Sequence, residues 1–284
     1  MINLIIEGGS IIIAVLGPRG SFAHQAALEA GIREEDLLFL NDIPSIFEKV
    51  ESDVAKYGLV PLENSLEGSV NLTLDLLAKS NLLIKEEIII EISHCLLGKE
   101  GANTEDIEVI LSHPHAIAQV RDFLREKFPR CQFINTLSTS EAALKVSKEK
   151  NKNIAAIASP IASEIYALKI LIENIPTPYQ SFTRFVIIGK EDSEPSGYDK
   201  TSIAFGLLEN KPGSLYKALE PFALKNINLT KIESRPSKRV LGEYIFFVDL
   251  EGHREDKKVK EALEELKPKT EMLKIFGSYR RGDI

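Results

Sequence analysis

The sequence predicts a two-domain α/β protein, and three observations support this prediction. The chain has 284 residues, which is long for one hydrophobic core and comfortable for two. The first 190 residues alternate short β-branched runs with helical patterns, as expected for βα units around a largely parallel sheet. The remaining residues follow the order strand, helix, strand, strand, helix, strand, which is typical of a small ferredoxin-like domain.

The first domain is expected over residues 11–190, with a polar loop wherever a strand leads into a helix. The predicted strands and the loops that follow them are 11–16 with G-P-R-G-S (17–21), 57–62 with E-N-S-L-E-G-S (63–69), 109–111 with S-H-P-H (112–115), and 154–158 with Ser159-Pro160. In open α/β sheets, ligands bind at the carboxyl ends of the strands, where helix starts offer free N–H groups. These loops are therefore candidates for a site that binds a small anion.

A polar linker is expected at residues 191–200 (E-D-S-E-P-S-G-Y-D-K), because this stretch holds Pro and Gly and has no apolar periodicity. The second domain then covers residues 201–284. Its small sheet leaves an edge strand open, which favours a homodimer through this domain, or a tetramer. Residues 1–10 carry no motif and are interpreted as an extension or an extra edge strand.

Composition and charge exclude several classes of function. Hydrophobic residues make up 44% of the chain and charged residues 27%, the balance of an ordinary globular protein without a membrane span. The net charge is −7 and no Lys/Arg block occurs, so neither nucleic acid nor anionic lipid is an expected partner. Cys95 and Cys131 fit no disulfide framework or zinc spacing. Because the N-terminus has no basic leader, a cytoplasmic location is expected.

The segment S-H-P-H-A-I-A-Q (112–119) presents polar side chains on one face of a predicted helix. Helical geometry gathers Ile117, Val120, Leu124 and Phe128 on the buried face, and places His115 and Gln119 together on the opposite one. Ser112 either caps the helix or donates its hydroxyl to a ligand. His113 and His115 lack a third ligand at a supporting spacing, so no metal site is expected.

Two further segments carry candidate polar residues. Glu63 and Asn64 fall at the end of a strand, where Glu63 fits a general acid, a hydrogen-bonding orienter or a cap. In S-F-T-R-F (181–185), Thr183 and Arg184 stand at the mouth of an apolar strand. A half-buried guanidinium needs an anion, which favours an anion site, although a solvent-facing arginine on an edge strand fits these five residues equally well.

The loop G-P-R-G-S lacks the Lys of a phosphate loop and the third Gly of a dinucleotide fingerprint, so no nucleotide cofactor is expected. No hydrolase or zinc-protease signature occurs, and His94 beside Cys95 is interpreted as a chance neighbour. From the residues alone, the protein is a cofactor-free binder of a small anion, either a sensor or an enzyme.

At these same motifs the chain resembles the prephenate dehydratases of phenylalanine biosynthesis, and its C-terminal part resembles their ACT regulatory domain. The matching segments are G-P-R-G-S-F (17–22), V-P-L-E-N-S-L-E-G-S-V (60–70), S-H-P-H-A-I-A-Q (112–119), T-S-E-A-A (139–143), A-A-I-A-S (155–159), T-R-F (183–185), K-P-G-S-L-Y-K-A-L (211–219) and E-S-R-P (233–236). The resemblance implies a two-lobed, type II periplasmic-binding-protein-like catalytic domain. No helical mutase domain precedes residue 11, so a monofunctional enzyme is expected.

The resemblance also implies roles for individual residues. Thr183 is the leading catalytic residue and Arg184 a carboxylate anchor. The other implied catalytic positions are Glu63, Ser112 and Gln119, and the implied substrate-binding positions are Ser21, Asn64, Ser65, His115 and Phe185. Phenylalanine is the implied effector, with a site at Gly213, Ser214, Leu215, Glu233, Ser234, Arg235 and Pro236. The family usually has Gln at His115, Thr at Ser21 and Asn at Ser181, so the chain departs from the family pattern at these three positions.

The implied reaction converts prephenate into phenylpyruvate, water and CO₂. Formation of the aromatic ring drives it, so neither a metal nor a redox cofactor is expected. Thr183 donates a hydrogen bond to the leaving oxygen in this scheme, backed by Glu63, His115 or water. Two alternatives stay open: an arogenate dehydratase, whose substrate differs by an amine, and a non-catalytic sensor of amino acids or carboxylates.

Overall fold

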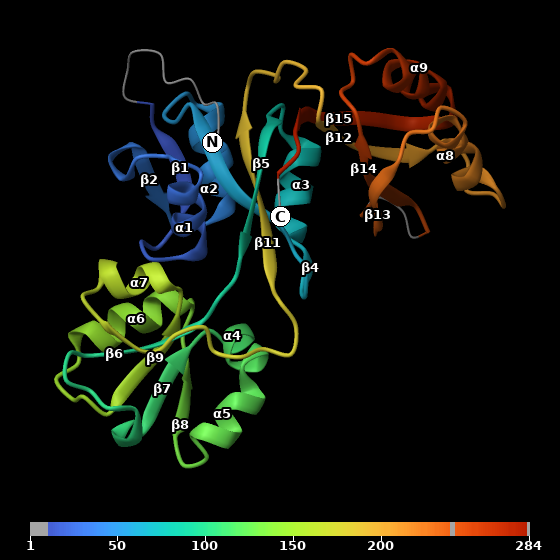
Figure 1. The fold of residues 1–284 in the computed structure, drawn as a ribbon. Coiled ribbons are helices and arrows are strands. Elements are labelled where there is room, and N and C mark those ends of the chain that lie inside the picture. Colours follow the sequence, from blue (N-terminus) through green and yellow to red (C-terminus); the bar gives the residue numbers. More distant parts are fainter. Residues whose placement is uncertain (1–10, 239–241, 283–284) are drawn as a thin grey trace.

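Two lobes and a C-terminal domain follow one another along the chain (Figure 1). The computed structural model describes residues 11–238 and 242–282, so the expectation for residues 1–10 lies outside the described part. Within that part, no helix is long and apolar enough to cross a membrane.

The first lobe is a mixed sheet with helices packed on it. Its elements are β1 (Ile13–Leu16), α1 (Phe22–Glu29), η1 (Glu34–Asp36), β2 (Leu37–Leu40), α2 (Ile43–Glu51), β3 (Tyr57–Asn64), β4 (Gly68–Ser69), α3 (Asn71–Lys79), β5 (Leu83–Glu91) and β11 (Phe182–Gly189). Strand β1 runs parallel to β2 and β3, whereas β11 runs antiparallel to both β3 and β5. The expected largely parallel sheet is therefore wrong here, because β5 leads towards the second lobe and β11 brings the chain back.

The second lobe lies below the first in Figure 1 and is entered and left through these two crossings. Its elements are β6 (Cys95–Gly98), η2 (Thr104–Asp106), β7 (Val109–Ser112), α4 (Pro114–Gln119), α5 (Arg121–Lys127), β8 (Gln132–Asn135), α6 (Thr139–Lys148), β9 (Ile154–Ala158), α7 (Pro160–Ile165) and β10 (Lys169–Ile172). The single helix expected after Ser112 is two helices that meet at Val120. Val120, Leu124 and Phe128 are nevertheless buried, as the helical pattern predicts.

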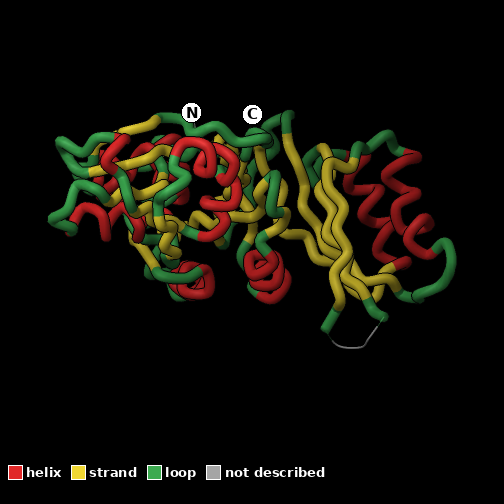
Figure 2. The backbone as a smooth tube through the Cα atoms, turned by 90° about the horizontal axis from the view of Figure 1, so that it is seen from below, coloured by secondary structure: helices red, strands yellow, loops and turns green. Residues whose placement is uncertain are grey.

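The C-terminal domain has the predicted order of strands and helices. Its elements are β12 (Asp199–Leu207), α8 (Ser214–Leu224), β13 (Leu229–Pro236), β14 (Tyr244–Glu251), α9 (Lys257–Leu266), η3 (Lys267–Lys269) and β15 (Thr270–Arg280). The strand order is β13-β14-β12-β15, and both helices cover one face of this sheet (Figure 2). Strand β12 begins at Asp199, so the last two residues of the expected linker belong to the sheet.

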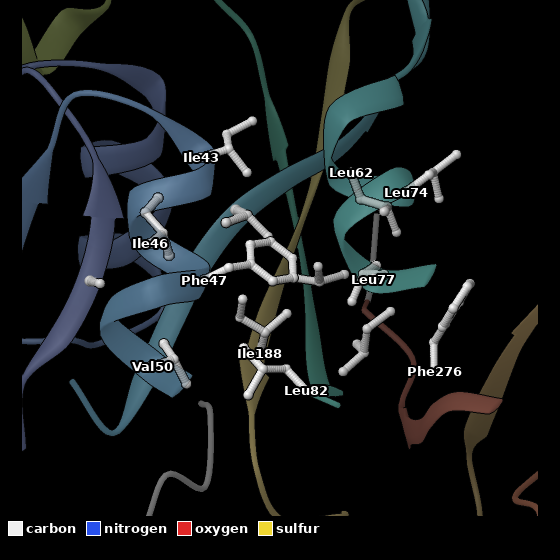
Figure 3. Close-up of a cluster of buried hydrophobic side chains, with 14 of the residues drawn as sticks. Ile43, Ile46, Phe47, Val50, Leu62, Leu74, Leu77, Leu82, Ile188 and Phe276 are labelled. Atoms are coloured by element: carbon white, nitrogen blue, oxygen red, sulfur yellow. The ribbon is translucent and has the colours of Figure 1, made fainter. Parts of the chain in front are cut away.

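The other face of this C-terminal sheet packs against the first lobe. Phe247 and Phe276 join a core cluster that contains Phe47 of α2 and Leu77 of α3 (Figure 3 shows Phe47, Leu77 and Phe276). Removing one such buried phenylalanine side chain typically costs about 3–5 kcal/mol. The two sheets also join directly, because β15 pairs with β5 at Arg280 and Glu86.

Gly277 makes this close approach possible. Its φ is +141°, and a Cβ at this position would lie 2.3 Å from the carbonyl oxygen of Ile84 on β5. Any other residue would push β15 away from β5. The C-terminal domain is therefore built onto the first lobe as a continuation of its sheet.

Candidate active site

The strand pair β3–β11 carries four of the candidate residues. Thr183 lies opposite Asn64, and Arg184 lies opposite Glu63. Successive side chains of a strand point to opposite faces of the sheet, so Thr183 and Arg184 face in opposite directions. The strand therefore divides these four residues into two separate groups.

Asn64 and Thr183 form the first group. The Asn64 side-chain oxygen accepts hydrogen bonds from the backbone N–H groups of Leu66 and Glu67, at 2.9 and 3.0 Å. This fixes the amide, whose Nδ2 donates to Oγ1 of Thr183 at 3.0 Å and to Oγ of Ser181 at 3.1 Å. Because the Thr183 oxygen accepts from Asn64, its hydroxyl proton is free to be donated to a ligand.

Ser65 and Phe185 hold this group in place. The Ser65 hydroxyl accepts from the backbone N–H of Phe182 at 2.9 Å, and the backbone N–H of Ser65 donates to the carbonyl of Phe182 at 2.8 Å. The two bonds tie the loop after β3 to the start of β11. Phe185 is 3% exposed and packs in a core cluster, which supports the strand behind Thr183, and its contact with substrate stays a prediction.

Arg184 belongs to the second group, which faces the C-terminal domain. Its side chain forms an ion pair with Glu87 of β5, bonds Oδ2 of Asp249 at 2.5 Å and bonds the Tyr279 hydroxyl at 2.6 Å. It is 8% exposed. Burial opposes the charge of Arg184, but Tyr279 and Asp249 outweigh it and raise the pKa of the guanidinium. The expected anchoring of a substrate carboxylate beside Thr183 is corrected: the anions that meet Arg184 are protein carboxylates.

The other charges of this second group are balanced. Lys200 bonds both carboxylate oxygens of Glu87, at 2.8 and 3.0 Å. Although burial alone would raise the pKa of Asp249, the charge of Arg184 and the hydroxyl of Ser202 hold it below its usual range. We call Arg184, Glu87, Asp249, Lys200, Ser202 and Tyr279 the interdomain polar core.

Glu63 also faces the C-terminal domain. Its carboxylate lies 3.1 Å from Nζ of Lys231 on β13 and 3.6 Å from Nη1 of Arg184. This position corrects the expectation that Glu63 supports the Thr183 hydroxyl, because Glu63 and Thr183 project from opposite faces of the paired strands.

Two of the candidate serines have structural partners. Ser112 is fully buried, and its hydroxyl donates to the carbonyl of Ile157 at 2.7 Å, which ties β7 to β9. Ser21 caps α1, because its hydroxyl accepts from the backbone N–H of His24 and donates to the carbonyl of Leu16. The helix cap expected at Ser112 is wrong, because His113 caps α4, and the cap at Ser21 was not predicted from the sequence. The contact of Ser112 with a ligand stays a prediction.

His115 and Gln119 lie on α4, at the side of the second lobe that faces the first (Figure 1). Nδ1 of the exposed His115 lies 3.8 Å from the carboxylate of Glu67, in the loop that follows Asn64. This contact brings the segment 112–119 close to the segment 63–69, as an active site between the lobes requires.

The loop 17–21 joins the lobes at a second place. The carbonyl of Gly20 accepts from Ser159 at 2.7 Å, and the carbonyl of Arg19 accepts from Tyr166 at 2.5 Å and from Ser140. Three segments expected at the site, 17–21, 139–143 and 155–159, therefore meet across the lobe boundary.

His94 contacts residues of both lobes, which its place beside Cys95 in the sequence does not predict. Its ring Nε2 lies 3.0 Å from Oε1 of Gln119, and its ring meets Phe22 edge-on, with 5.6 Å between the ring centroids. The only signal in the sequence was a histidine placed between two strand-like runs, which is too weak to identify a partner.

The predicted effector segments are split by the same strand alternation. On β13, the Glu233 carboxylate accepts a hydrogen bond from the Ser69 hydroxyl. Arg235 donates to the Asp75 carboxylate at 2.9 Å. Both residues face the first lobe in this structure, and their contact with the effector stays a prediction. Ser234 and Pro236 are exposed on the other side, and Gly213 starts α8 with a φ of +82° ahead of Ser214 and Leu215.

Among the described residues, no group of three or more His, Cys, Asp or Glu side chains has the arrangement of a metal site. His113 and His115 contact each other edge-on, with 4.9 Å between their ring centroids.

Comparisons with known proteins agree with this layout. Residues 13–193 match the family model described as prephenate dehydratase, and residues 201–268 match the ACT domain. The chain is 46% identical to a bifunctional chorismate mutase/prephenate dehydratase of Aquifex aeolicus, over 95% of this chain and 73% of the relative. It is 39% identical to a prephenate dehydratase of Methanocaldococcus jannaschii, over 92% and 95%. It is 36% identical to arogenate dehydratase 2 of Petunia hybrida, over 98% and 73%.

Two solved structures have the same architecture. A prephenate dehydratase from Arthrobacter aurescens in complex with L-Phe superposes with a TM-score of 0.86 at 32% identity, covering 95% of this chain and 90% of that one. A protein described as a novel type of quorum-quenching acylase also gives a TM-score of 0.86, at 31% identity, over 95% and 97%.

Proposed function

Because the chain belongs to the prephenate dehydratase family, we propose that it acts through Thr183, whose hydroxyl is aimed by Asn64. The protein is a prephenate dehydratase with an ACT regulatory domain. The observation that carries the residue assignment is the chain of hydrogen bonds from the loop N–H groups through the Asn64 amide to Thr183. Within the described residues the Thr183 hydroxyl makes no hydrogen bond other than the one it accepts from Asn64, so its proton is available to a ligand.

The reaction requires a donor at one oxygen. In prephenate, the bond to the departing carboxylate breaks, its electron pair moves into the ring, and the ring C–O bond breaks as hydroxide leaves. One proton from solvent completes the water molecule, so prephenate and a proton give phenylpyruvate, CO₂ and water. A threonine hydroxyl is too weak an acid to surrender its proton, so Thr183 stabilises the leaving oxygen by a hydrogen bond.

Gln119 supplies a second donor from the other lobe. Within the described residues, its Nε2 has no hydrogen bond, while its Oε1 faces His94. We assign this amide N–H₂ group to a carboxylate or carbonyl oxygen of the substrate. Binding between the lobes then orients the substrate against Thr183.

The test is to incubate the purified protein with prephenate and to follow phenylpyruvate by chromatography. We expect turnover by the natural chain, and a loss of about 10² to 10³ in kcat for Thr183→Ala with an unchanged melting temperature. Near-normal kcat in a folded Thr183→Ala protein would remove the assignment.

The same experiment distinguishes the alternatives. Conversion of arogenate in preference to prephenate would identify an arogenate dehydratase. Tight binding of prephenate without turnover would identify a sensor. Hydrolysis of an acylated amine with no activity on prephenate would place this chain with the acylase that shares its fold.

Phenylalanine is the proposed effector. The Arthrobacter aurescens relative carries L-Phe in its solved structure, and it covers both domains of this chain. We place the effector beside Gly213, Ser214 and Leu215 and the exposed residues Ser234 and Pro236. Calorimetry with phenylalanine tests this, and absence of binding to the intact protein would remove it.

A homodimer through the ACT domain is the proposed assembly. Within the described residues, β13 pairs only with β14, so its other edge is open. Ile232 on this strand is 49% exposed, and Tyr216 and Leu224 of α8 are about as exposed or more so. Light scattering should give twice the chain mass or more for the natural protein, and a smaller mass for Ile232→Lys. A reducing cytoplasm fits the two free thiols of Cys95 and Cys131.

A further inference from the structure

His94 occupies the segment that carries the chain from the first lobe to the second, between β5 and β6. It is 3% exposed. Its backbone carbonyl accepts from the N–H of Ile175, which belongs to the segment that leads back towards β11. The ring contacts Phe22 at the start of α1 and Gln119 at the end of α4. One side chain therefore touches residues of both lobes at the place where the lobes are joined.

The hydrogen bond to Gln119 has a defined direction. The Gln119 atom that faces the ring is Oε1, which only accepts, so Nε2 of His94 carries the hydrogen and donates it. Burial lowers the pKa of His94, and the hydrogen bond to Gln119 opposes this only in part. The ring is therefore neutral near pH 7, with its proton on Nε2.

The other ring nitrogen carries no partner. Nδ1 of His94 is buried and makes no hydrogen bond within the described residues. A histidine that served only to tie the fold together would be expected to use both nitrogens, because an unpaired buried nitrogen is costly. The ring is held instead by its neighbours and by a single bond, and that bond ends on a candidate substrate ligand.

We propose that His94 is a positioning residue for the dehydratase reaction: it holds Oε1 of Gln119, and so turns the amide N–H₂ group of Gln119 towards the substrate. This rests on the proposed role of Gln119. An amide has an accepting end and a donating end, and a half-turn exchanges them. Without His94, Oε1 of Gln119 would face the anionic substrate part of the time. In that orientation the two oxygens repel each other and the substrate binds less tightly.

The second consequence of the proposal concerns the lobes. Phe22 lies in the segment 17–22, whose carbonyl groups accept hydrogen bonds from the second lobe. Because the His94 ring packs against Phe22 as well as Gln119, the amide is oriented with reference to the first lobe, which also carries Thr183. The Gln119 amide and the Thr183 hydroxyl therefore keep a fixed position relative to each other.

The experiment measures kcat and KM for prephenate in four variants of the full chain. His94→Phe keeps an aromatic ring beside Phe22 and removes the donor, whereas His94→Gln keeps an N–H near the position of Nε2. Gln119→Ala removes the residue through which His94 acts, and the fourth variant combines His94→Phe with Gln119→Ala. His253→Phe is the matched control, because His253 is also buried and bonded through Nε2, but to the carbonyl of Ser193 outside the lobes.

We expect His94→Phe to raise KM about tenfold with a small change in kcat, and His94→Gln to recover most of this loss. His253→Phe should leave KM unchanged. In the Gln119→Ala background, His94→Phe should add less than twofold, because its route of action is gone. Melting temperatures of all variants separate folding from binding.

The outcomes separate this proposal from the assignment beneath it. If Gln119→Ala has no effect on KM or kcat, the role of Gln119 in the site is wrong, and the His94 proposal falls with it. If Gln119→Ala is impaired but His94→Phe is not, the role of Gln119 stands and the positioning role of His94 is wrong. If His94→Phe is equally harmful with and without Gln119, His94 acts by another route and the proposal is overturned.

Discussion

Asn64 shows how one amide can decide what a neighbouring hydroxyl does. Its oxygen is occupied by two backbone N–H groups, so its nitrogen must face Thr183 and Ser181. A hydroxyl that accepts in this way keeps its proton for a ligand. The reactivity of Thr183 is thus set by the backbone of the loop that follows β3.

Asn64→Asp tests this arrangement with almost no change in shape. The loop N–H groups still find an oxygen, but the atom facing Thr183 becomes an acceptor, so the hydroxyl turns its proton towards the carboxylate. We expect kcat to fall about 10²-fold, as for the loss of one transition-state donor. The measurement is steady-state turnover of prephenate at constant pH.

Ser181→Ala is the control for this substitution, because it removes only the second acceptor of the Asn64 amide. Its kcat should stay within a few-fold of the natural protein. An Asn64→Asp enzyme with kcat within twofold of normal would show that Thr183 does not depend on Asn64.

At the scale of the strand, β11 separates two functions by side-chain alternation. Thr183 lies on the face where it meets the Asn64 amide, and Arg184 faces the C-terminal domain. Removing one partner of a buried charge cluster leaves the others unpaired and typically costs about 3–5 kcal/mol. Arg184 therefore matters for stability and for the contact between domains.

Arg184→Lys should retain charge but lose the forked contacts with Glu87, Asp249 and Tyr279. The planar guanidinium has several N–H donors and contacts all three partners at once, whereas the compact lysine ammonium can contact only one of them closely. We expect a loss of about 2 kcal/mol in the free energy of unfolding measured in urea, with KM for prephenate changed less than twofold. A KM raised tenfold or more with little loss of stability would restore the carboxylate-anchor role.

Glu86, next to β15, makes the sheet junction sensitive to pH. Burial raises the pKa of its carboxyl to about 7, and the nearby charge of Arg280 offsets this only in part. The group is protonated in both folded and unfolded chains below about pH 4.5, its ordinary value. Between there and about pH 7 the unfolded chain ionises first, so the junction loses stability as pH rises through this window.

Glu86→Gln should therefore be more stable than the natural protein at pH 8, with the difference vanishing near pH 4. Urea unfolding at pH 4, 6 and 8 measures it. Glu91→Gln, at the exposed end of the same strand, serves as control and should show no such trend. A difference that is the same at pH 4 and pH 8 would contradict the raised pKa.

The elements were predictable because their signals are local. Ser21, Pro160 and Gly213 mark helix starts, and alternating β-branched runs mark the strands. Strand alternation also predicts that the side chains of Thr183 and Arg184 point to opposite faces of the sheet, and it predicts the same for Glu63 and Asn64. No sequence pattern predicts which residues pack against each face of β11. Asp249 and Tyr279 lie more than sixty residues from Arg184, and only the fold brings them together.

At the scale of the whole molecule, the two domains share one sheet and several polar contacts. Besides the interdomain polar core, Ser69 on β4 accepts from Lys231 at 2.6 Å and donates to Glu233, both on β13. Strand β4 pairs with β3 through Glu63 and Asn64. Strand β13, which carries the proposed effector residues Ser234 and Pro236, is thus connected to Asn64 through Ser69 and the pairing of β4 with β3.

This connection predicts where inhibition by phenylalanine can be uncoupled from its binding. Allosteric inhibition needs a free-energy difference between two arrangements, typically 1–3 kcal/mol, which corresponds to a 5- to 150-fold change in affinity. Ser69→Ala removes both bonds between β4 and β13 while leaving Gly213 and Pro236 untouched. We expect the factor by which saturating phenylalanine raises KM for prephenate to fall at least fivefold, towards one, while calorimetry without substrate gives a Kd changed less than twofold.

Ser52→Ala, which alters a serine at the end of α2 away from β13, should leave inhibition unchanged. Linkage supplies an independent check: saturating prephenate should weaken phenylalanine binding by the same factor by which phenylalanine weakens prephenate binding, and that factor should shrink towards one in Ser69→Ala. Were inhibition to survive intact in Ser69→Ala, the signal would have to cross between the domains elsewhere, and the interdomain polar core around Arg184 is the next contact to test. Loss of inhibition in Arg184→Lys but not in Ser69→Ala would assign the coupling to that core rather than to the contact between Ser69 and β13.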